Sequence, residues 1–164
     1  MSRRKLFYMV PSLAAAVALL AAYMLEYRYG LIPCTLCLME RGLMWLVLLS
    51  ACVGLLQPSG RPLGRLEPAR LVTSVFAMAG MLVAGRHTWL QQFGGSAGCA
   101  PELDYMLRHW PWQKTIGMLF SSQECAIVDW SLFHLSLAAW ALVAFGFMFL
   151  WLLAGPALFA SKLT

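Results

Sequence analysis

The chain has 164 residues, of which 61% are apolar and only 12% are charged, whereas soluble domains average about 45–50% and 25%. So few polar side chains cannot cover a soluble globule, and the low charge with abundant aromatic residues excludes an intrinsically disordered chain. The net charge is +5, but the longest basic run is Arg3-Arg4-Lys5. We therefore expect no nucleic-acid partner and predict a single membrane domain over residues 1–164 in a lipid bilayer.

Long apolar stretches predict four transmembrane helices, at about residues 6–25, 37–56, 71–90 and 131–153. Roughly 20 helical residues, rising 1.5 Å each, cross a hydrocarbon core of about 30 Å. The first stretch is longer than the apolar region of a typical signal peptide and has no clear small-x-small cleavage site, so we expect it to be retained. The expected fold is an all-α bundle of four transmembrane helices.

The distribution of basic residues predicts the orientation of these helices. Lysine and arginine gather before the first stretch, in the 57–70 connection and at Lys162. Cytoplasmic segments carry this excess, so both termini are predicted to be cytoplasmic, with outer loops at about 26–36 and 91–130. Tryptophans on the outer side are typical of an interfacial aromatic belt: Trp89, Trp110, Trp112 and Trp130.

Four of the five cysteines fall on the predicted outer side, where disulfides persist: Cys34, Cys37, Cys99 and Cys125. Cys52 lies deep in the second apolar stretch, and we interpret it as a small buried hydrophobic residue. Pro33 suits the first turn of a helix, which places Cys34 and Cys37 on one face beside unpaired N–H groups. That positive helix end stabilises a thiolate, as does a nearby cation, and Arg41 lies one turn after Cys37.

The Cys-x-x-Cys pattern favours a redox-active dithiol at the membrane–water boundary over two alternatives, half of a zinc site or an inert bridge. Zinc usually needs a second Cys or His pair, and Cys99 and Cys125 are not clustered. A bridge between Cys99 and Cys125 could be a structural staple worth about 3–4 kcal/mol. The glycine-rich approach at 94–98 instead favours disulfide exchange with another protein.

A short amphipathic helix is predicted between Cys99 and Cys125. Leu103, Met106, Leu107 and Trp110 follow helical spacing, and Pro111 ends the pattern. This helix is too short to span a bilayer. Its apolar face would lie on the outer membrane surface or pack against the helix bundle.

Together these residues resemble the disulfide bond formation protein B (DsbB) family of bacterial inner-membrane thiol oxidoreductases. The resemblance covers nearly the whole chain. It rests on four apolar stretches, on Cys34-Thr35-Leu36-Cys37 with Glu40-Arg41 at the head of the second, and on Cys99 and Cys125 in the second outer loop. Cys-x-x-Cys alone is a weak signal. The combination at the head of a transmembrane helix, with a second cysteine pair in the next outer loop, is specific.

The resemblance implies an enzyme, a protein-disulfide:quinone oxidoreductase of the bacterial inner membrane. Such a protein reoxidises a DsbA-like periplasmic oxidase of the thioredoxin fold and passes the electrons to ubiquinone or menaquinone. The redox disulfides would be Cys34–Cys37 and Cys99–Cys125, and the partner would attack Cys99. Cys37 would face the quinone, with Arg41 as the adjacent cation, Glu40 orienting Arg41 or the interface, and His87 bonding a quinone carbonyl.

Three other functions remain open from the residues. A vitamin K epoxide reductase-like oxidase also combines a helical bundle, Cys-x-x-Cys and quinone, although its redox motif usually lies late in the chain. A metal-handling membrane protein would use Cys34 and Cys37 as soft ligands. A non-catalytic scaffold stapled by Cys99–Cys125 would tolerate loss of Cys34 or Cys37.

Overall fold

Four long helices and one small hairpin make up the computed structural model, which describes residues 3–30, 33–57, 67–93, 108–109, 111 and 131–160. The elements are α1 (Arg3–Tyr29), α2 (Thr35–Leu56), α3 (Pro68–Phe93), β1 (Ser131–Leu132), β2 (Leu135–Ser136) and α6 (Leu137–Ala160). All four helices are long and apolar enough to cross a membrane. The predicted all-α bundle of four transmembrane helices is confirmed.

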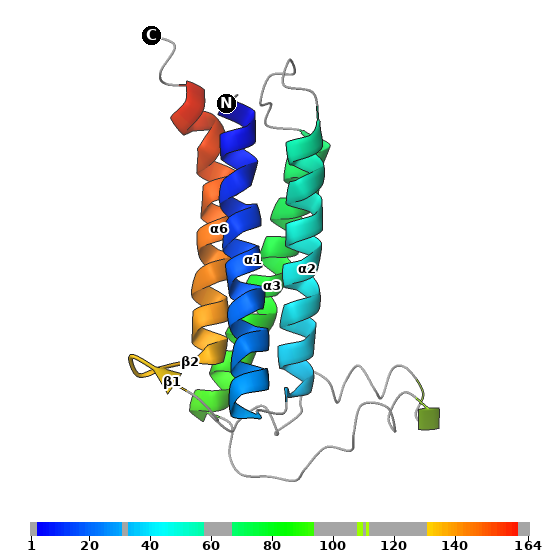
Figure 1. Ribbon diagram of the computed structural model, residues 1–164, viewed down its shortest axis with the longest axis vertical. Coiled ribbons are helices and arrows are strands. Elements are labelled where there is room, and N and C mark those ends of the chain that lie inside the picture. The colour runs from blue at the N-terminus through cyan, green and yellow to red at the C-terminus, as the bar shows by residue number, and fades with distance from the viewer. Residues whose placement is uncertain are drawn as a thin grey trace.

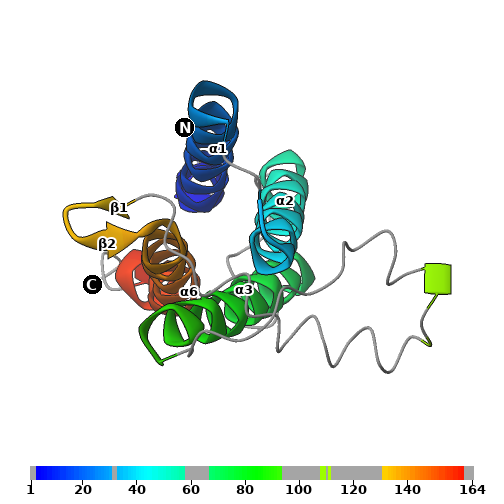
Figure 2. The same cartoon turned by 90° about the horizontal axis from the view of Figure 1, so that it is seen from below.

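The helices run side by side along the long axis of the molecule (Figure 1). Seen along that axis, α1 lies beside α2, α2 beside α3, and α3 beside α6, while α1 contacts α6 less extensively (Figure 2). The start of α1 and the end of α6 lie at one end of the bundle. The start of α2, where the Cys-x-x-Cys pattern falls, lies at the other end with the hairpin (Figure 1).

The observed helices are longer than the apolar stretches, and the last one begins later than expected. Residues 131–136 form the β1–β2 hairpin, with Ser131 opposite Ser136 and Leu132 opposite Leu135, so α6 starts only at Leu137. The two turn residues, Phe133 and His134, both have positive φ, at 53° and 63°. This left-handed pair matches the two-residue hairpin turn whose twist suits antiparallel strands.

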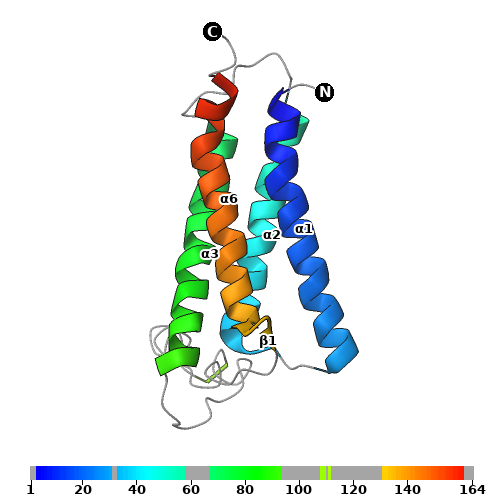
Figure 3. The ribbon, with the colours of Figure 1, turned by 90° about the vertical axis from the view of Figure 1, so that its left-hand side faces the viewer.

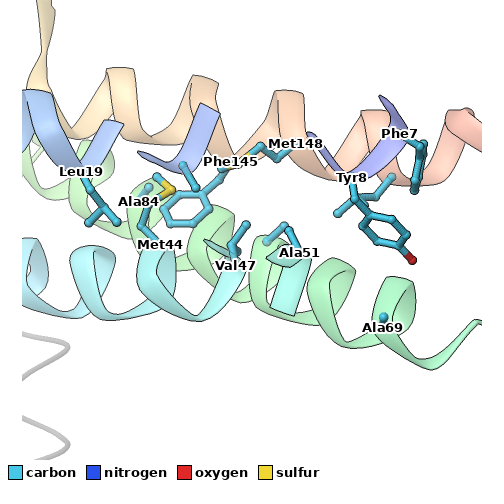
Figure 4. Packing of buried hydrophobic residues seen from close by; sticks show 13 residues of the cluster. Phe7, Tyr8, Leu19, Met44, Val47, Ala51, Ala69, Ala84, Phe145 and Met148 are labelled. Atoms are coloured by element: carbon cyan, nitrogen blue, oxygen red, sulfur yellow. The ribbon is translucent and has the colours of Figure 1, made fainter. Parts of the chain in front are cut away.

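The core of the bundle is packed by side chains from all four helices (Figure 4). Phe7 and Phe145 are fully buried, and each ring lies against a glycine on another helix. A Cβ at Gly155 would overlap the ring of Phe7, and one at Gly80 would overlap the ring of Phe145. Close helix approach at small residues is the usual way in which membrane helices associate, because lipid offers apolar side chains the same contacts as protein does.

The outward-facing surface of the bundle is also apolar. Large hydrophobic side chains are more than half exposed on every spanning helix, as at Leu13 (62%), Leu49 (56%), Leu82 (65%) and Leu150 (65%). A soluble bundle would place charged residues at such positions. The chain is therefore a multi-pass membrane protein, with lipid as the solvent of these faces.

An ion pair joins the helices at the end of the bundle opposite the Cys-x-x-Cys pattern. Arg4 bonds Glu67 and Gln57, and the side chains of Arg4 and Glu67 are only 4% and 9% exposed. The neighbouring Arg70 donates from Nε to the carbonyl of Leu152 over 2.7 Å. Arg4 and Arg70 belong to the basic set from which a cytoplasmic end was predicted.

Candidate dithiol site

The two cysteines of the Cys-x-x-Cys pattern lie together at the first turn of α2. Cys34 is the N-cap, with extended backbone, and its Sγ accepts a hydrogen bond from the backbone N–H of Cys37 over 3.3 Å. The two sulfurs are 3.1 Å apart, as half-buried thiols. An S–S bond is about 2.05 Å long, so only a small side-chain rotation separates this dithiol from bonding distance.

A buried Glu–His pair lies next to Cys34. Glu40 of α2 and His87 of α3 are 8% and 2% exposed, and Glu40 Oε1 lies 2.8 Å from His87 Nδ1. An ionised carboxylate only accepts hydrogen bonds, so the ring donates from Nδ1 to Glu40. The other ring nitrogen, Nε2, then faces Cys34 Sγ at 3.8 Å.

Arg41 turns the other way, toward α1. Its Nη1 pairs with Glu26, its Nη2 lies 3.5 Å from the carbonyl oxygen of Ala22, and its guanidinium stands 5.0 Å from the ring centroid of Tyr23. The Arg41 side chain is 14% exposed and that of Glu26 is 35% exposed. Glu26 thus pairs with Arg41, and Glu40 pairs with His87. The expected role of Glu40 in orienting Arg41 or the interface stays a prediction.

An apolar cavity of about 380 Å³ lies between α1, α2 and α6, and Leu132 of the hairpin contributes to its wall. That volume falls within the roughly 300–1,000 Å³ typical of small-molecule sites. Three chemically active side chains line it, Cys37, Glu40 and Arg41, and the remaining lining residues are apolar. Figure 3 shows α1 diverging from α6 toward this end of the bundle.

The cavity also reaches the lipid-facing surface of the bundle. Val17 and Trp140 belong to its wall, and they are 57% and 37% exposed. His87 is not one of the lining residues, so its predicted contact with a quinone carbonyl stays a prediction. Cys52, expected to be buried, is half-buried on α2.

Cys99, Cys125 and most of the predicted amphipathic helix lie outside the described residues. Of that helix, Arg108 and His109 are described, and both are helical and exposed.

The thiols and the imidazole also form a group that could bind a metal ion. One ligand atom each from Cys34, Cys37 and His87 lies within 4.8 Å of the others. Sequence reasoning did not foresee this cluster, because its third member comes from α3. The Glu40–His87 and Glu26–Arg41 pairs were missed because the two partners of each pair come from different helices. The only available signal was an ionisable residue inside an apolar stretch, which by itself marks a functional position.

Comparison with known proteins gives one consistent family. The family model described as disulfide bond formation protein DsbB matches residues 3–155. Disulfide bond formation protein B of Azoarcus sp. (strain BH72) is 37% identical over 160 residues, covering 94% of each chain. Disulfide bond formation protein B 1 of Pseudomonas aeruginosa (strain PAO1) is 34% identical over 147 residues, 88% of each chain. No solved structure gives a significant match. The chain therefore belongs to the DsbB family of disulfide bond formation membrane proteins.

Proposed function

We propose that this protein is a thiol oxidase that takes electrons from a periplasmic DsbA-like thioredoxin-fold protein and delivers them to a membrane quinone. The observation that carries the proposal is the position of Cys37. Its side chain lines the apolar cavity beside Arg41, and its sulfur lies 3.1 Å from that of Cys34. Cys37 thus meets a lipid-accessible cavity, while the dithiol as a whole lies at the end of the bundle where α2 begins.

The cavity wall matches the chemistry of a quinone head group. An apolar lining suits the ring and its tail, and a single cation suits an oxygen that gains negative charge during reduction. Cys37 and Arg41 would hold the ring of ubiquinone or menaquinone. The quinone would supply a two-electron acceptor of higher potential than a thiol pair.

The proposed electron path passes through four thiol–disulfide exchanges before the quinone. A thiolate of the reduced partner attacks the Cys99–Cys125 disulfide at Cys99, and the released Cys125 attacks the Cys34–Cys37 disulfide. These exchanges leave one mixed disulfide between the partner and Cys99 and a second between Cys125 and a cysteine of the Cys34–Cys37 pair. The partner's second thiol then displaces Cys99, and Cys99 attacks the second mixed disulfide at Cys125, which restores Cys99–Cys125 and releases the Cys34–Cys37 dithiol. That dithiol would close again by giving two electrons to a bound quinone, which takes up two protons. This path requires the Cys34 end of the bundle to face the periplasm, with both termini in the cytoplasm of a bacterium and the helices in its inner membrane.

Quinone reduction by the purified protein tests the proposal. Detergent-solubilised protein receives a reduced thioredoxin-fold oxidase and a short-chain ubiquinone or menaquinone, and quinol formation is followed by absorbance. We expect turnover that is abolished in Cys37→Ser and retained in Cys52→Ser, a matched change at a half-buried cysteine on the same helix. No quinol formation by the unmodified protein, or full activity of Cys37→Ser, would refute the proposal.

A second candidate function, metal handling, is favoured by the grouping of Cys34, Cys37 and His87. Two thiolates and an imidazole suit zinc or another thiophilic ion. This function predicts stoichiometric metal in protein purified under reducing conditions, lost in His87→Gln, and no dependence of activity on quinone. Family membership favours the oxidase over this candidate, over a vitamin K epoxide reductase-like oxidase and over a non-catalytic scaffold.

A further inference from the structure

The buried pair of Glu40 and His87 has no part in the proposed electron path. Both side chains are more than nine-tenths buried in a membrane protein, where ionisable groups are costly to retain and commonly form proton pathways. A purely structural link between α2 and α3 could be made by neutral side chains. The contacts of the pair with Cys34 and with the cavity indicate what function an ionisable link could have.

The pair connects Cys34 to the cavity. His87 Nε2 lies 3.8 Å from Cys34 Sγ, and His87 Nδ1 lies 2.8 Å from Glu40 Oε1. Glu40 lines the cavity, as does Cys37, whereas Cys34 and His87 do not. Cys37 therefore reaches a cavity ligand directly, and Cys34 reaches it through His87 and Glu40.

Closure of the disulfide requires a proton acceptor near Cys34. When a Cys37 thiolate and a Cys34 thiol form an S–S bond, two electrons leave the sulfurs and the Cys34 proton must be accepted by a base. The quinone that receives the electrons takes up two protons. In an apolar cavity, bulk water delivers protons slowly, so a fixed donor in the wall that supplies one of the two has an advantage.

We infer that His87 and Glu40 form a proton relay that carries the Cys34 proton into the cavity. This inference rests on the proposed function and deepens it. As the S–S bond forms, the Cys34 proton moves to His87 Nε2, the Nδ1 proton moves to Glu40, and Glu40 passes a proton to a quinone oxygen. The second proton of the quinol comes from solvent. His87 is thus the base that touches the reacting sulfur, and Glu40 positions the ring and completes the path.

Steady-state quinone reduction separates this relay from a structural link. Glu40→Gln is nearly isosteric, and its amide oxygen can still accept the Nδ1–H, but it cannot transfer a proton. We expect kcat to fall by about 100-fold, the scale of general acid–base catalysis, with the quinone KM changed by less than about threefold. Glu40→Asp keeps the carboxylate and should restore part of kcat. Glu67→Gln makes the same change in the buried pair with Arg4 at the opposite end and should leave kcat unchanged.

A second measurement needs neither quinone nor partner. In a protein in which Cys34 is the single cysteine, all others being alanine, the rate of alkylation by iodoacetamide reports removal of the Cys34 proton. We expect His87→Gln and Glu40→Gln to slow it by about tenfold, because the base or its orienting partner is lost. In the matching protein that retains only Cys37, the same changes should alter alkylation by less than about threefold.

The outcomes are distinct for the two proposals. Wild-type kcat in Glu40→Gln, or equal slowing of Cys34 and Cys37 alkylation, would overturn the relay while leaving the oxidase function intact. If the unmodified protein reduces no quinone, the proposed function fails. In that case the alkylation comparison still decides whether His87 acts as the base for Cys34.

Discussion

Replacement of Arg41 by methionine tests how the cation beside the cavity contributes to quinone reduction and to the stability of the bundle. Arg41 both pairs with Glu26 and lines the cavity with Cys37. Methionine keeps a long, flexible apolar chain and removes only the charged fork. The substitution thus removes two separate contributions, a link between α1 and α2 and a positive charge beside the proposed electron acceptor.

The two contributions differ in size. The Glu26 side chain is 35% exposed, so its carboxylate remains solvated after the loss of Arg41, and the free energy of unfolding should fall by only about 1 kcal/mol. A charge-assisted hydrogen bond to the reacting ring is worth about 1.5–3 kcal/mol. At about 1.4 kcal/mol per tenfold, kcat/KM for quinone should fall roughly 10–100-fold.

The assay separates the quinone step from the partner step. Stopped-flow oxidation of the reduced thioredoxin-fold partner reports the exchange at Cys99, which the resemblance assigns to the outer loop, and Arg41→Met should leave it nearly unchanged. Steady-state quinol formation should carry the loss. Arg41→Lys keeps the charge without the planar fork and should recover only part of the rate.

Glu26→Gln is the matched control, because it breaks the same ion pair and leaves the Arg41 charge in place. If the charge acts on the cavity, Glu26→Gln should lower stability about as much as Arg41→Met does, and kcat/KM by less than about threefold. Equal kinetic losses in the two variants would show that the ion pair alone matters. Equal losses in the partner and quinone steps would also refute the reasoning.

Two further predictions concern the loop disulfide and the core. When the partner is supplied in its disulfide form, the free Cys99 thiol of Cys125→Ser should attack that disulfide and remain joined to the partner, because the resolving thiol Cys125 is gone. The mixed disulfide is seen as a higher-mass band on non-reducing gels and is absent when both cysteines are serine; trapping by Cys99→Ser alone would reverse the assignment. Gly80→Ala should lower the free energy of unfolding by about 1–3 kcal/mol in thermal or denaturant melts, because its Cβ overlaps the Phe145 ring. Gly146→Ala, with nothing within 4 Å of its Cβ, should not destabilise, and equal behaviour of the two would contradict this account.

The four helices could be predicted because bilayer thickness imposes a length on each apolar stretch. The shared face of Cys34 and Cys37 follows from helical spacing within one element, and so could be predicted too. The hairpin could not, because its turn is Phe133-His134, both at positive φ. Asparagine and glycine are the usual signal for such a turn. Without them, residues 131–136 read as the first turns of an apolar helix.

Side-chain pairs between helices depend on how each helix is rotated about its own axis. In a stretch that is apolar on all sides, the sequence does not indicate which face points toward which neighbouring helix. Successive residues of a helix point about 100° apart, so Glu40 and Arg41, though adjacent, face different neighbours. Glu40 turns toward His87 on α3, and Arg41 turns toward Glu26 on α1. Cys37 lies one turn from both, and all three side chains line the cavity. The short segment from Cys37 to Arg41 thereby presents a sulfur, a carboxylate and a cation to one ligand, while α3 holds the carboxylate through His87 and α1 holds the cation through Glu26.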